Sequence, residues 1–268
     1  MYATDFEYDG RRLSDYGFII CAFDGSSGIN IADNGYKMTF NKVKRNYGKK
    51  YGLTNIQYED CLQSSFQICK DPEECDMMIS PEEYNELMRW LSRREFLKFR
   101  VISEHDFGRP MCWFNASFNV KKILIADKLY GLDLTMETNS PFGYGPEFIK
   151  TFNFSAGSSE SFVDMSDDVG FVYPDLVIRC LQAGTLTLTN DVTGSQMTIK
   201  NCLSGEVITV HGDTMIVSSS VSNHKIYDDF NFEFLSIGNT FGSRTNTITS
   251  TLPCTIELRY SPPIKDIP

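Results

Sequence analysis

The sequence predicts a mainly β protein of two domains, with a single α-helix in the N-terminal one. Three observations lead to this prediction. Only one stretch has both the periodicity and the end signals of a helix, short alternating apolar segments fill most of the remaining chain, and one segment rich in proline and glycine separates two regions of different composition. The chain has 268 residues, of which 41% are hydrophobic and 22% are charged, so it can form two cores and is not disordered.

The first part of the chain reads as strands and turns. Residues 6–24 hold two apolar runs around turn-rich Asp-Gly and Ser-Asp steps, which predicts a strand pair near a sheet edge. Asn34-Gly35 favours a two-residue type I′ hairpin. Residues 40–58 then form a predicted hairpin arm with many basic and aromatic side chains: Lys42, Lys44, Arg45, Tyr47, Lys49, Lys50 and Tyr51.

Two interpretations of this basic arm are open. It could project and grip an acidic neighbour, or it could be a solvated hairpin whose charges only prevent edge-to-edge aggregation. The local sequence by itself favours the solvated hairpin, because most charge runs are solvated faces.

The predicted helix covers residues 80–94, approximately. Ser80 is a good N-cap, Pro81 fits the first helical position, and Glu83 completes a capping box. The apolar positions that follow at helical spacing form one stripe: Tyr84, Leu87, Met88 and Leu91. We expect this stripe to pack on a sheet whose strands include residues 65–69, 96–102, 113–120 and 132–136.

The domain boundary is predicted at Asn139, where the segment NSPFGYGP begins. The N-terminal domain is therefore residues 1–139 and the C-terminal domain residues 140–268. The C-terminal half contains no credible helix, and its period-two alternation with regular turn signals predicts an antiparallel β-sandwich. The predicted strands are centred on Leu176/Ile178, Leu186/Leu188, Met197/Ile199, Val207/Thr209, Phe230/Phe232/Phe234 and Ile256/Leu258/Tyr260.

The composition argues against several classes of protein. A net charge of −10 repels phosphate backbones, which disfavours specific binding of DNA or RNA. No segment is long enough to span a bilayer, and the apolar run at 16–23 has the wrong flank for a secretory signal, so we expect synthesis in the cytoplasm and no membrane partner. The eight cysteines form no CxxC pair and no cluster with histidine, which predicts reduced thiols.

The search for catalytic motifs is negative. The sequence has no GxSxG elbow, P-loop, GxGxxG fingerprint or HExxH helix. His105, His211 and His224 are isolated, and we interpret them as surface or turn residues. Tyr144, Phe171 and Tyr173 could form an aromatic platform for sugar rings, although packing is the commoner role of such aromatics. We expect no enzymatic activity, catalytic residue, metal or cofactor.

Four segments resemble the distal tail protein family of long-tailed, non-contractile bacteriophages and prophages. They are residues 6–24 (FEYDGRRLSDYGFIICAFD), Arg89-Trp90-Leu91 within the helix, SPFGYG at 140–145, and IYDDFNFEFLSIGNT at 226–240. No single segment is specific, but their order and spacing cover essentially the whole chain.

The resemblance implies an N-terminal β-sandwich with one helix and a β-hairpin, and a C-terminal sandwich of galectin-like or carbohydrate-binding-module-like shape. It further implies a homohexameric ring at the virion tail tip, the hub between the tail tube and the baseplate, with DNA passing through the centre. The partners would be other copies of the chain, the tail tube protein, the tape-measure protein, and a tail-tip, tail-associated lysin or receptor-binding protein. In such a ring the basic arm would dock a neighbouring subunit or the tube, and Arg89 and Arg93 on the polar face of the helix could meet a neighbouring subunit.

Two other functions are kept as alternatives. One is a carbohydrate-binding protein whose C-terminal sandwich recognises a host surface glycan, and the other is a β-sandwich glycoside hydrolase. Extended members of the family carry inserted sugar-binding modules, for which this chain is too short, and fold shape alone does not confer glycan binding.

Overall fold

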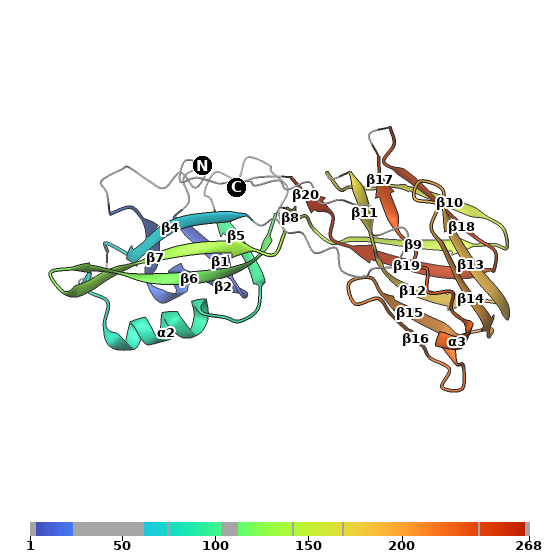
Figure 1. Cartoon of the computed structure of the whole chain (residues 1–268), viewed down its shortest axis with the longest axis horizontal. Coiled ribbons are helices and arrows are strands. Elements are labelled where there is room, and N and C mark those ends of the chain that lie inside the picture. The colour runs from blue at the N-terminus through green and yellow to red at the C-terminus, as the bar shows by residue number, and fades with distance from the viewer. Residues whose placement is uncertain are drawn as a thin grey trace. The chain divides into compact units, whose positions relative to one another are not determined.

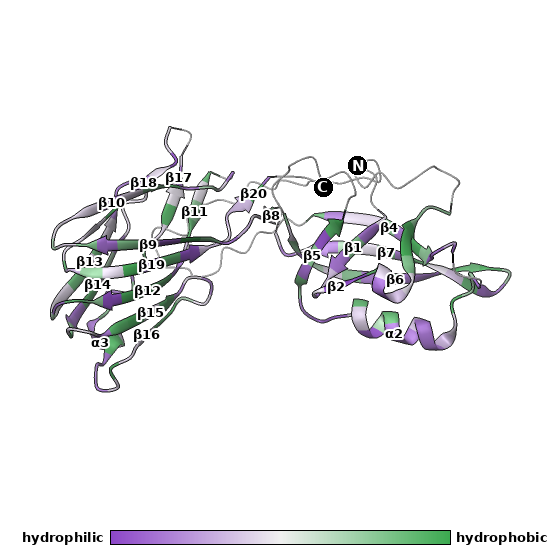
Figure 2. Cartoon of the chain, turned by 180° about the vertical axis from the view of Figure 1, so that it is seen from behind, coloured by the Kyte–Doolittle hydropathy of each residue, from purple (hydrophilic) through white to green (hydrophobic). Residues whose placement is uncertain are grey.

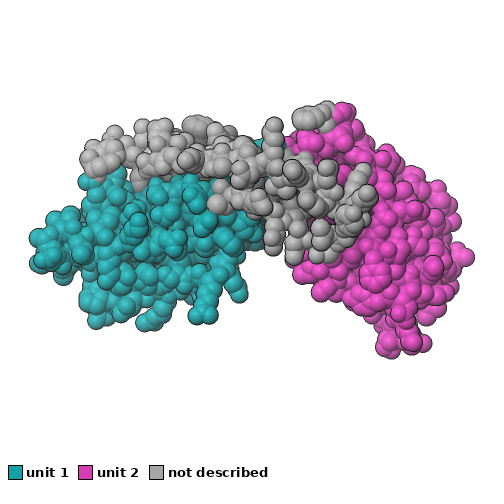
Figure 3. Space-filling model, viewed as in Figure 1, with its two compact units in different colours: residues 1–43, 57–144, 265–268 teal, residues 44–56, 145–264 magenta. Residues whose placement is uncertain are grey.

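The structure, a computed structural model, describes residues 4–23, 62–73, 76–102, 112–140, 142–167, 169–240 and 242–265. It forms two compact units (Figure 3). The described residues up to Tyr144, with Lys265, belong to the N-terminal unit, and Gly145–Ile264 belong to the C-terminal unit. Both are built mainly from β-strands, which confirms the predicted fold class (Figure 1). Among the described helices, none is long and apolar enough to cross a membrane.

The N-terminal unit contains one seven-stranded antiparallel sheet in the order β2-β1-β5-β6-β7-β4-β3. Its strands are β1 (Asp5–Tyr8), β2 (Arg11–Arg12), β3 (Phe18–Cys21), β4 (Gln63–Lys70), β5 (Leu97–Ile102), β6 (Phe114–Ile125) and β7 (Lys128–Thr138). The 3-10 turn η1 (Ser14–Tyr16) joins β2 to β3, and the short strand β8 (Gly143–Tyr144) lies beside Trp113.

This sheet rolls until its two ends meet. Phe6 on β1 and Phe66 on β4 are four strand spacings apart, about 19 Å in a flat sheet, yet their ring centroids are 5.6 Å apart. At the seam, the backbone N–H of Ile20 donates to the carbonyl of Thr4 at 2.9 Å. A single rolled sheet therefore encloses the apolar interior that the family resemblance describes as a sandwich.

Helix α2 (Pro81–Leu91) begins where the sequence predicts. The Ser80 hydroxyl accepts a hydrogen bond from the Glu83 amide at 3.2 Å, and the Glu83 carboxylate accepts one from the Ser80 amide at 2.7 Å, so the capping box is confirmed. The helix ends at Leu91, earlier than the predicted residue 94, because Ser92 leaves helical geometry with ψ 74°.

The buried face of α2 is broader than the predicted stripe. Leu87, Trp90 and Leu91 are buried, whereas Tyr84 and Met88 are only half-buried. The Trp90 indole stacks on Phe6 at 5.6 Å and donates a hydrogen bond to the carbonyl of Tyr8 at 2.9 Å. Trp90 lies beside the predicted apolar stripe, and its large indole ring extends into the core from there. The helical spacing of apolar residues therefore did not predict its burial.

The C-terminal unit is a β-sandwich. One sheet has the order β16-β15-β12-β19-β9 and the other β10-β18-β13-β14, with a separate pair β11-β17. Apolar residues from both sheets form one core, and the alternation that buries them is visible in Figure 2. The strands are β9 (Phe148–Phe154), β10 (Ser159–Val163), β11 (Gly170–Val172), β12 (Asp175–Cys180), β13 (Gly184–Asn190), β14 (Gln196–Cys202), β15 (Val207–His211), β16 (Ile216–Ser219), β17 (Ile237–Asn239), β18 (Thr245–Ser250), β19 (Cys254–Tyr260) and β20 (Pro263–Ile264).

One predicted strand is wrong. The alternation of Phe230, Phe232 and Phe234 predicts a strand, but this segment makes only an isolated bridge between Phe230 and Ile199. A short helix, α3 (Ile226–Asp229), precedes it. The segment lies along the edge of β14 and uses side chains, rather than a continuous backbone ladder, to satisfy that edge.

Candidate interaction surfaces

The predicted basic arm lies outside the described residues. This applies to the whole hairpin at 40–58, including Lys42, Lys44, Arg45, Tyr47, Lys49, Lys50 and Tyr51. Its role as a docking arm stays a prediction.

A second arm, at β6–β7, was not recognised from the sequence as a projection. In the described sheet, β5 pairs with β6 only over Phe114–Ala116, and β4 pairs with β7 only from Gly131 onward. Residues 121–130, which we call the β6–β7 arm, therefore extend beyond the other strands (Figure 1). Its turn residues Ala126 and Asp127 both have positive φ, 49° and 62°, which is the type I′ geometry usually marked by Asn-Gly. Because that marker is absent, the turn could not be predicted from the residue types.

The tip of this arm is apolar and its sides are basic. Leu124 is 55% exposed and Ile125 is 51% exposed. Lys121, Lys122 and Lys128 are exposed beside them. The ammonium of Lys122 lies 4.2 Å from the centre of the Tyr84 ring, so the base of the arm rests against α2. Figure 2 shows the hydrophobic residues at the end of the arm.

Arg89 lies on the exposed side of α2, whereas Arg93 is exposed just after the end of the helix, and the two differ in their surroundings. Arg93 forms an ion pair with Asp9 of the same chain at 3.2 Å, with both side chains about two-fifths exposed. Arg89 is exposed, and none of the described residues pairs with it. Arg89 is thus the more available of the two for a contact outside the chain.

The three aromatics considered as a glycan platform are divided between the units. Tyr144 belongs to the N-terminal unit, where its hydroxyl donates to the Ser140 hydroxyl at 3.2 Å. Phe171 lies on β11 opposite Gly238 in the C-terminal unit. Tyr173 is half-buried there, and burial raises its pKa. Each of the three side chains lies in different surroundings, and their role as a glycan platform stays a prediction.

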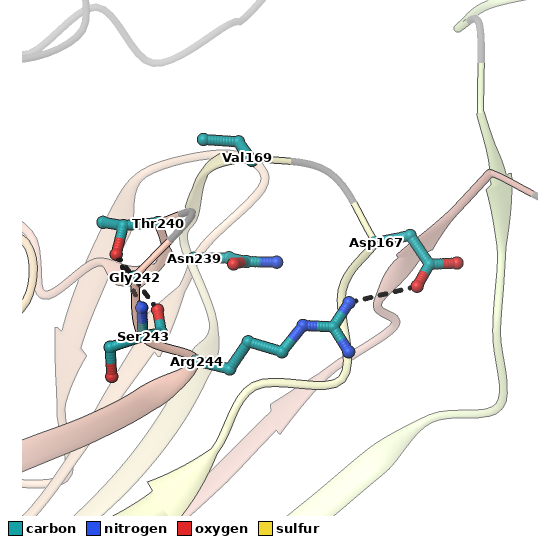
Figure 4. Close-up of a pocket in the computed structure, with 7 residues that line it drawn as sticks. All are labelled: Asp167, Val169, Asn239, Thr240, Gly242, Ser243 and Arg244. Carbon is teal, nitrogen blue, oxygen red and sulfur yellow. Dashed lines mark hydrogen bonds and ion pairs between the residues drawn. The ribbon is translucent and has the colours of Figure 1, made fainter.

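A polar cavity of about 330 Å³ lies at the ends of β11 and β17 (Figure 4). Its described lining is Asp167, Val169, Asn239, Thr240, Gly242, Ser243 and Arg244. The Arg244 guanidinium donates to the Asp167 carboxylate at 3.1 Å and to the Ser166 carbonyl at 2.7 Å, and the Asn239 amide donates to the same carbonyl at 2.7 Å. These hydrogen bonds connect residues of the cavity wall to one another and to Ser166. We therefore interpret the cavity as a structural feature that holds the loops together.

A buried charged pair lies elsewhere in the same unit. His224, predicted to be a surface or turn residue, follows the turn at 222–223, but its side chain is only 3% exposed and its Nδ1 lies 2.5 Å from the fully buried Glu206 carboxylate. Burial by itself lowers the pKa of His224, but the hydrogen bond and the charge of Glu206 outweigh it, so the pKa is raised. For Glu206, burial raises the pKa, and hydrogen bonds from Ser219, His224 and the Leu203 amide lower it further than burial raises it. No sequence signal linked these residues, because they are 18 positions apart.

Across the described residues, no group of three or more histidine, cysteine, aspartate or glutamate side chains could hold a metal ion. The six described cysteines carry free thiols.

Comparisons with known proteins give the fold and the family of the chain. The solved structure of the Dit (gp 19.1) protein of phage SPP1, titled a paradigm of the hub adsorption apparatus in Gram-positive infecting phages, superposes with a TM-score of 0.61. The match covers 96% of this chain and 98% of that one at 11% sequence identity, so it shows a shared fold. The comparison with curated proteins finds no match.

Two family models cover nearly the whole sequence. One, described as a phage tail protein N-terminal domain, matches residues 1–140. The other, described as a phage tail C-terminal domain, matches residues 142–260. The chain belongs to this family of phage tail proteins.

Proposed function

We propose that this tail protein is a distal tail protein, a homohexameric ring that joins the tail tube to the baseplate or tail tip. DNA would pass through the centre of the ring, and the protein would act by assembly rather than by catalysis. Membership of a phage tail family and the Dit-like fold support this function. The tail tube protein, the tape-measure protein and a lysin or receptor-binding protein at the tail tip are the proposed partners.

The β6–β7 arm is the observation that carries the proposal. Burying a Leu or Ile side chain contributes roughly 1.5–3 kcal/mol, and the monomer leaves both Leu124 and Ile125 half-exposed on a projecting hairpin. An arm on one surface that docks on a different surface of the next copy is a heterologous contact, and repetition of such a contact closes a ring.

Charge suggests where the arm docks. Lys121, Lys122 and Lys128 flank the apolar tip, and the N-terminal half of α2 presents the exposed carboxylates of Glu82 and Glu86. We place the arm of one copy against the α2 surface of its neighbour, because opposite charges favour that register. The net charge of −10 also suits a channel along which DNA must slide without binding.

The test is a double variant, Leu124→Asp with Ile125→Asp. Light scattering and electron microscopy of the wild-type protein should show six-fold rings, and the double variant should remain monomeric. Its melting temperature should stay close to that of the wild type, because both side chains are exposed in the monomer.

Ile149→Asp is the matched control. Ile149 is 52% exposed on β9 and belongs to the other compact unit, and its substitution should leave the rings intact. A wild-type protein that stays monomeric at all concentrations and in the presence of its tail partners would refute the ring. A double variant that assembles normally would refute the role of the arm.

A further inference from the structure

Two aromatic rings stand exposed side by side on the C-terminal unit. Tyr227, on α3, is 51% exposed and Phe232 is 60% exposed. Their ring centroids are 6.4 Å apart and their planes differ by only 21°. Helix α3 lies next to β14 and β16, so these rings sit over one corner of the sandwich (Figure 1).

Phe232 has a strained backbone. Its φ is 57°, in the left-handed region where a bulky side chain is a true outlier. The two flanking residues impose this conformation, since the Asn231 side chain accepts a hydrogen bond from the Thr198 amide at 3.0 Å and the Glu233 carboxylate accepts one from the Gln196 amide at 2.8 Å. Both flanking side chains face the edge of β14, and Phe232 between them turns outward.

Folding stability does not explain a phenylalanine at this position. Glycine or asparagine would adopt the same backbone with less strain, and a ring that is 60% exposed buries little apolar surface. Strain that the surroundings hold in place is concentrated at ligand-binding positions. The residue type at position 232 therefore points to a binding role.

The ring of Phe232 is supported from behind by other aromatic rings. Phe230 is buried, and its ring centroid lies 5.4 Å from that of Phe232. Phe234 in turn packs edge-on against Phe230 at 5.0 Å. A supported aromatic surface loses little conformational entropy when a ligand covers it.

The border of the pair is polar. Asp228 follows Tyr227 directly and is exposed, and among the described residues its carboxylate has no hydrogen-bond partner. The next residue, Asp229, accepts a hydrogen bond from the Asn201 side-chain amide at 2.8 Å. The centre of a protein–protein interface is depleted of charge, so an aromatic pair with an exposed carboxylate on the residue next to Tyr227 suits a small ligand with one apolar face and a hydroxyl rim better.

We propose that Tyr227 and Phe232 form a saccharide-binding platform. The C–H groups on one face of a pyranose ring would stack on the negative faces of the aromatic rings. The ring hydroxyls would donate hydrogen bonds to the carboxylate of Asp228. This activity is separate from ring assembly and does not depend on it.

The test measures binding of cellohexaose, chitohexaose and maltohexaose to the full-length protein by saturation-transfer NMR and calorimetry. At least one of these oligosaccharides should bind the wild type. Phe232→Asn and Tyr227→Ala should each weaken that binding by about tenfold or more. Because Asn tolerates the left-handed backbone, Phe232→Asn should melt at the same temperature as the wild type or higher.

Phe96→Ala is the matched control, since Phe96 is a phenylalanine of the N-terminal unit that is 45% exposed, and it should leave binding unchanged. The platform is refuted if none of the three oligosaccharides binds the wild type, or if Phe232→Asn binds as tightly as the wild type. A Phe232→Asn variant with a lower melting temperature would show that the ring is structural. None of these results would alter the six-fold rings expected of the proposed tail hub.

Discussion

At the scale of single residues, the buried pair of Glu206 and His224 links the stability of the C-terminal unit to pH. His224 also faces the Asp229 carboxylate at 3.3 Å and the Lys200 carbonyl at 3.1 Å. Because its folded pKa is raised, the contribution of His224 is complete below the unfolded value of 6.5 and is lost as the pH rises through the folded pKa. The folded pKa of Glu206 is lowered, so its contribution is complete above 4.5 and is lost as the pH falls through the folded pKa.

Thermal unfolding of this unit should therefore be most resistant between pH 4.5 and 6.5, and resistance should fall on the alkaline side as His224 loses its proton. Glu206→Gln should cost about 3 kcal/mol, because it removes the closer and more deeply buried of the two carboxylates that face His224 and leaves only Asp229. Calorimetry across this range checks both statements, with His211→Gln on the exposed end of β15 as a control. A flat profile above pH 6.5 would show that the pair is not ionised.

Residue-level roles were the hardest to predict from the sequence. Ser80 and Glu83 were identified correctly because a capping box is a local signal. His224 and Trp90 were not, because their partners Glu206 and Tyr8 are brought to them only by the fold. Phe232 was assigned to a strand because alternation counts residue types and is blind to the side-chain hydrogen bonds that set its backbone.

At the scale of elements, regular strands were predictable and the projecting arm was not. Strands β4, β5, β7, β12, β13, β14, β15 and β19 lie where alternation places them, because burial of one sheet face imposes a period of two. The β6–β7 arm leaves the core, so that constraint disappears, and its turn forms at Ala126-Asp127 without the usual residues. The binding features of the arm, an exposed apolar tip with basic sides, are seen from charge and exposure and not from periodicity.

The exposed face of α2 yields a prediction about assembly. Arg89→Glu should strengthen ring formation, because it replaces a positive charge by a negative one on the α2 surface where the basic arm of the neighbour is placed, and it should change the free energy of unfolding by less than about 0.5 kcal/mol. Arg93→Glu should instead destabilise the monomer by about 0.5 kcal/mol through loss of the exposed pair with Asp9. Light scattering and denaturant titration separate the two effects. If Arg89→Glu left ring formation unchanged, this face of α2 would be exposed to solvent in the assembly rather than part of a subunit contact.

At the scale of the whole molecule, the chain carries two separate cores. Among the described residues, every buried member of the C-terminal core lies between Phe152 and Tyr260. We predict that a fragment of residues 142–265 folds alone and melts in a single transition that matches one of the transitions of the full-length protein, because no residue of its core is missing. Calorimetry of the fragment checks this, and a fragment without a cooperative transition would show that the second unit depends on the first.

The rolled sheet of the N-terminal unit also determines when that unit can fold during synthesis. β7 is the last of the seven strands to leave the ribosome, yet it lies between β6 and β4 and joins the two parts of the sheet. Until Thr138 has emerged, β4 and β6 both lack the strand that pairs with them in the sheet, and β3 and β4 can reach the rest of the sheet only through the contacts at the seam with β1. The nascent chain is thus exposed to misassociation for most of the translation of this unit, and chaperone demand should end abruptly once β7 is complete.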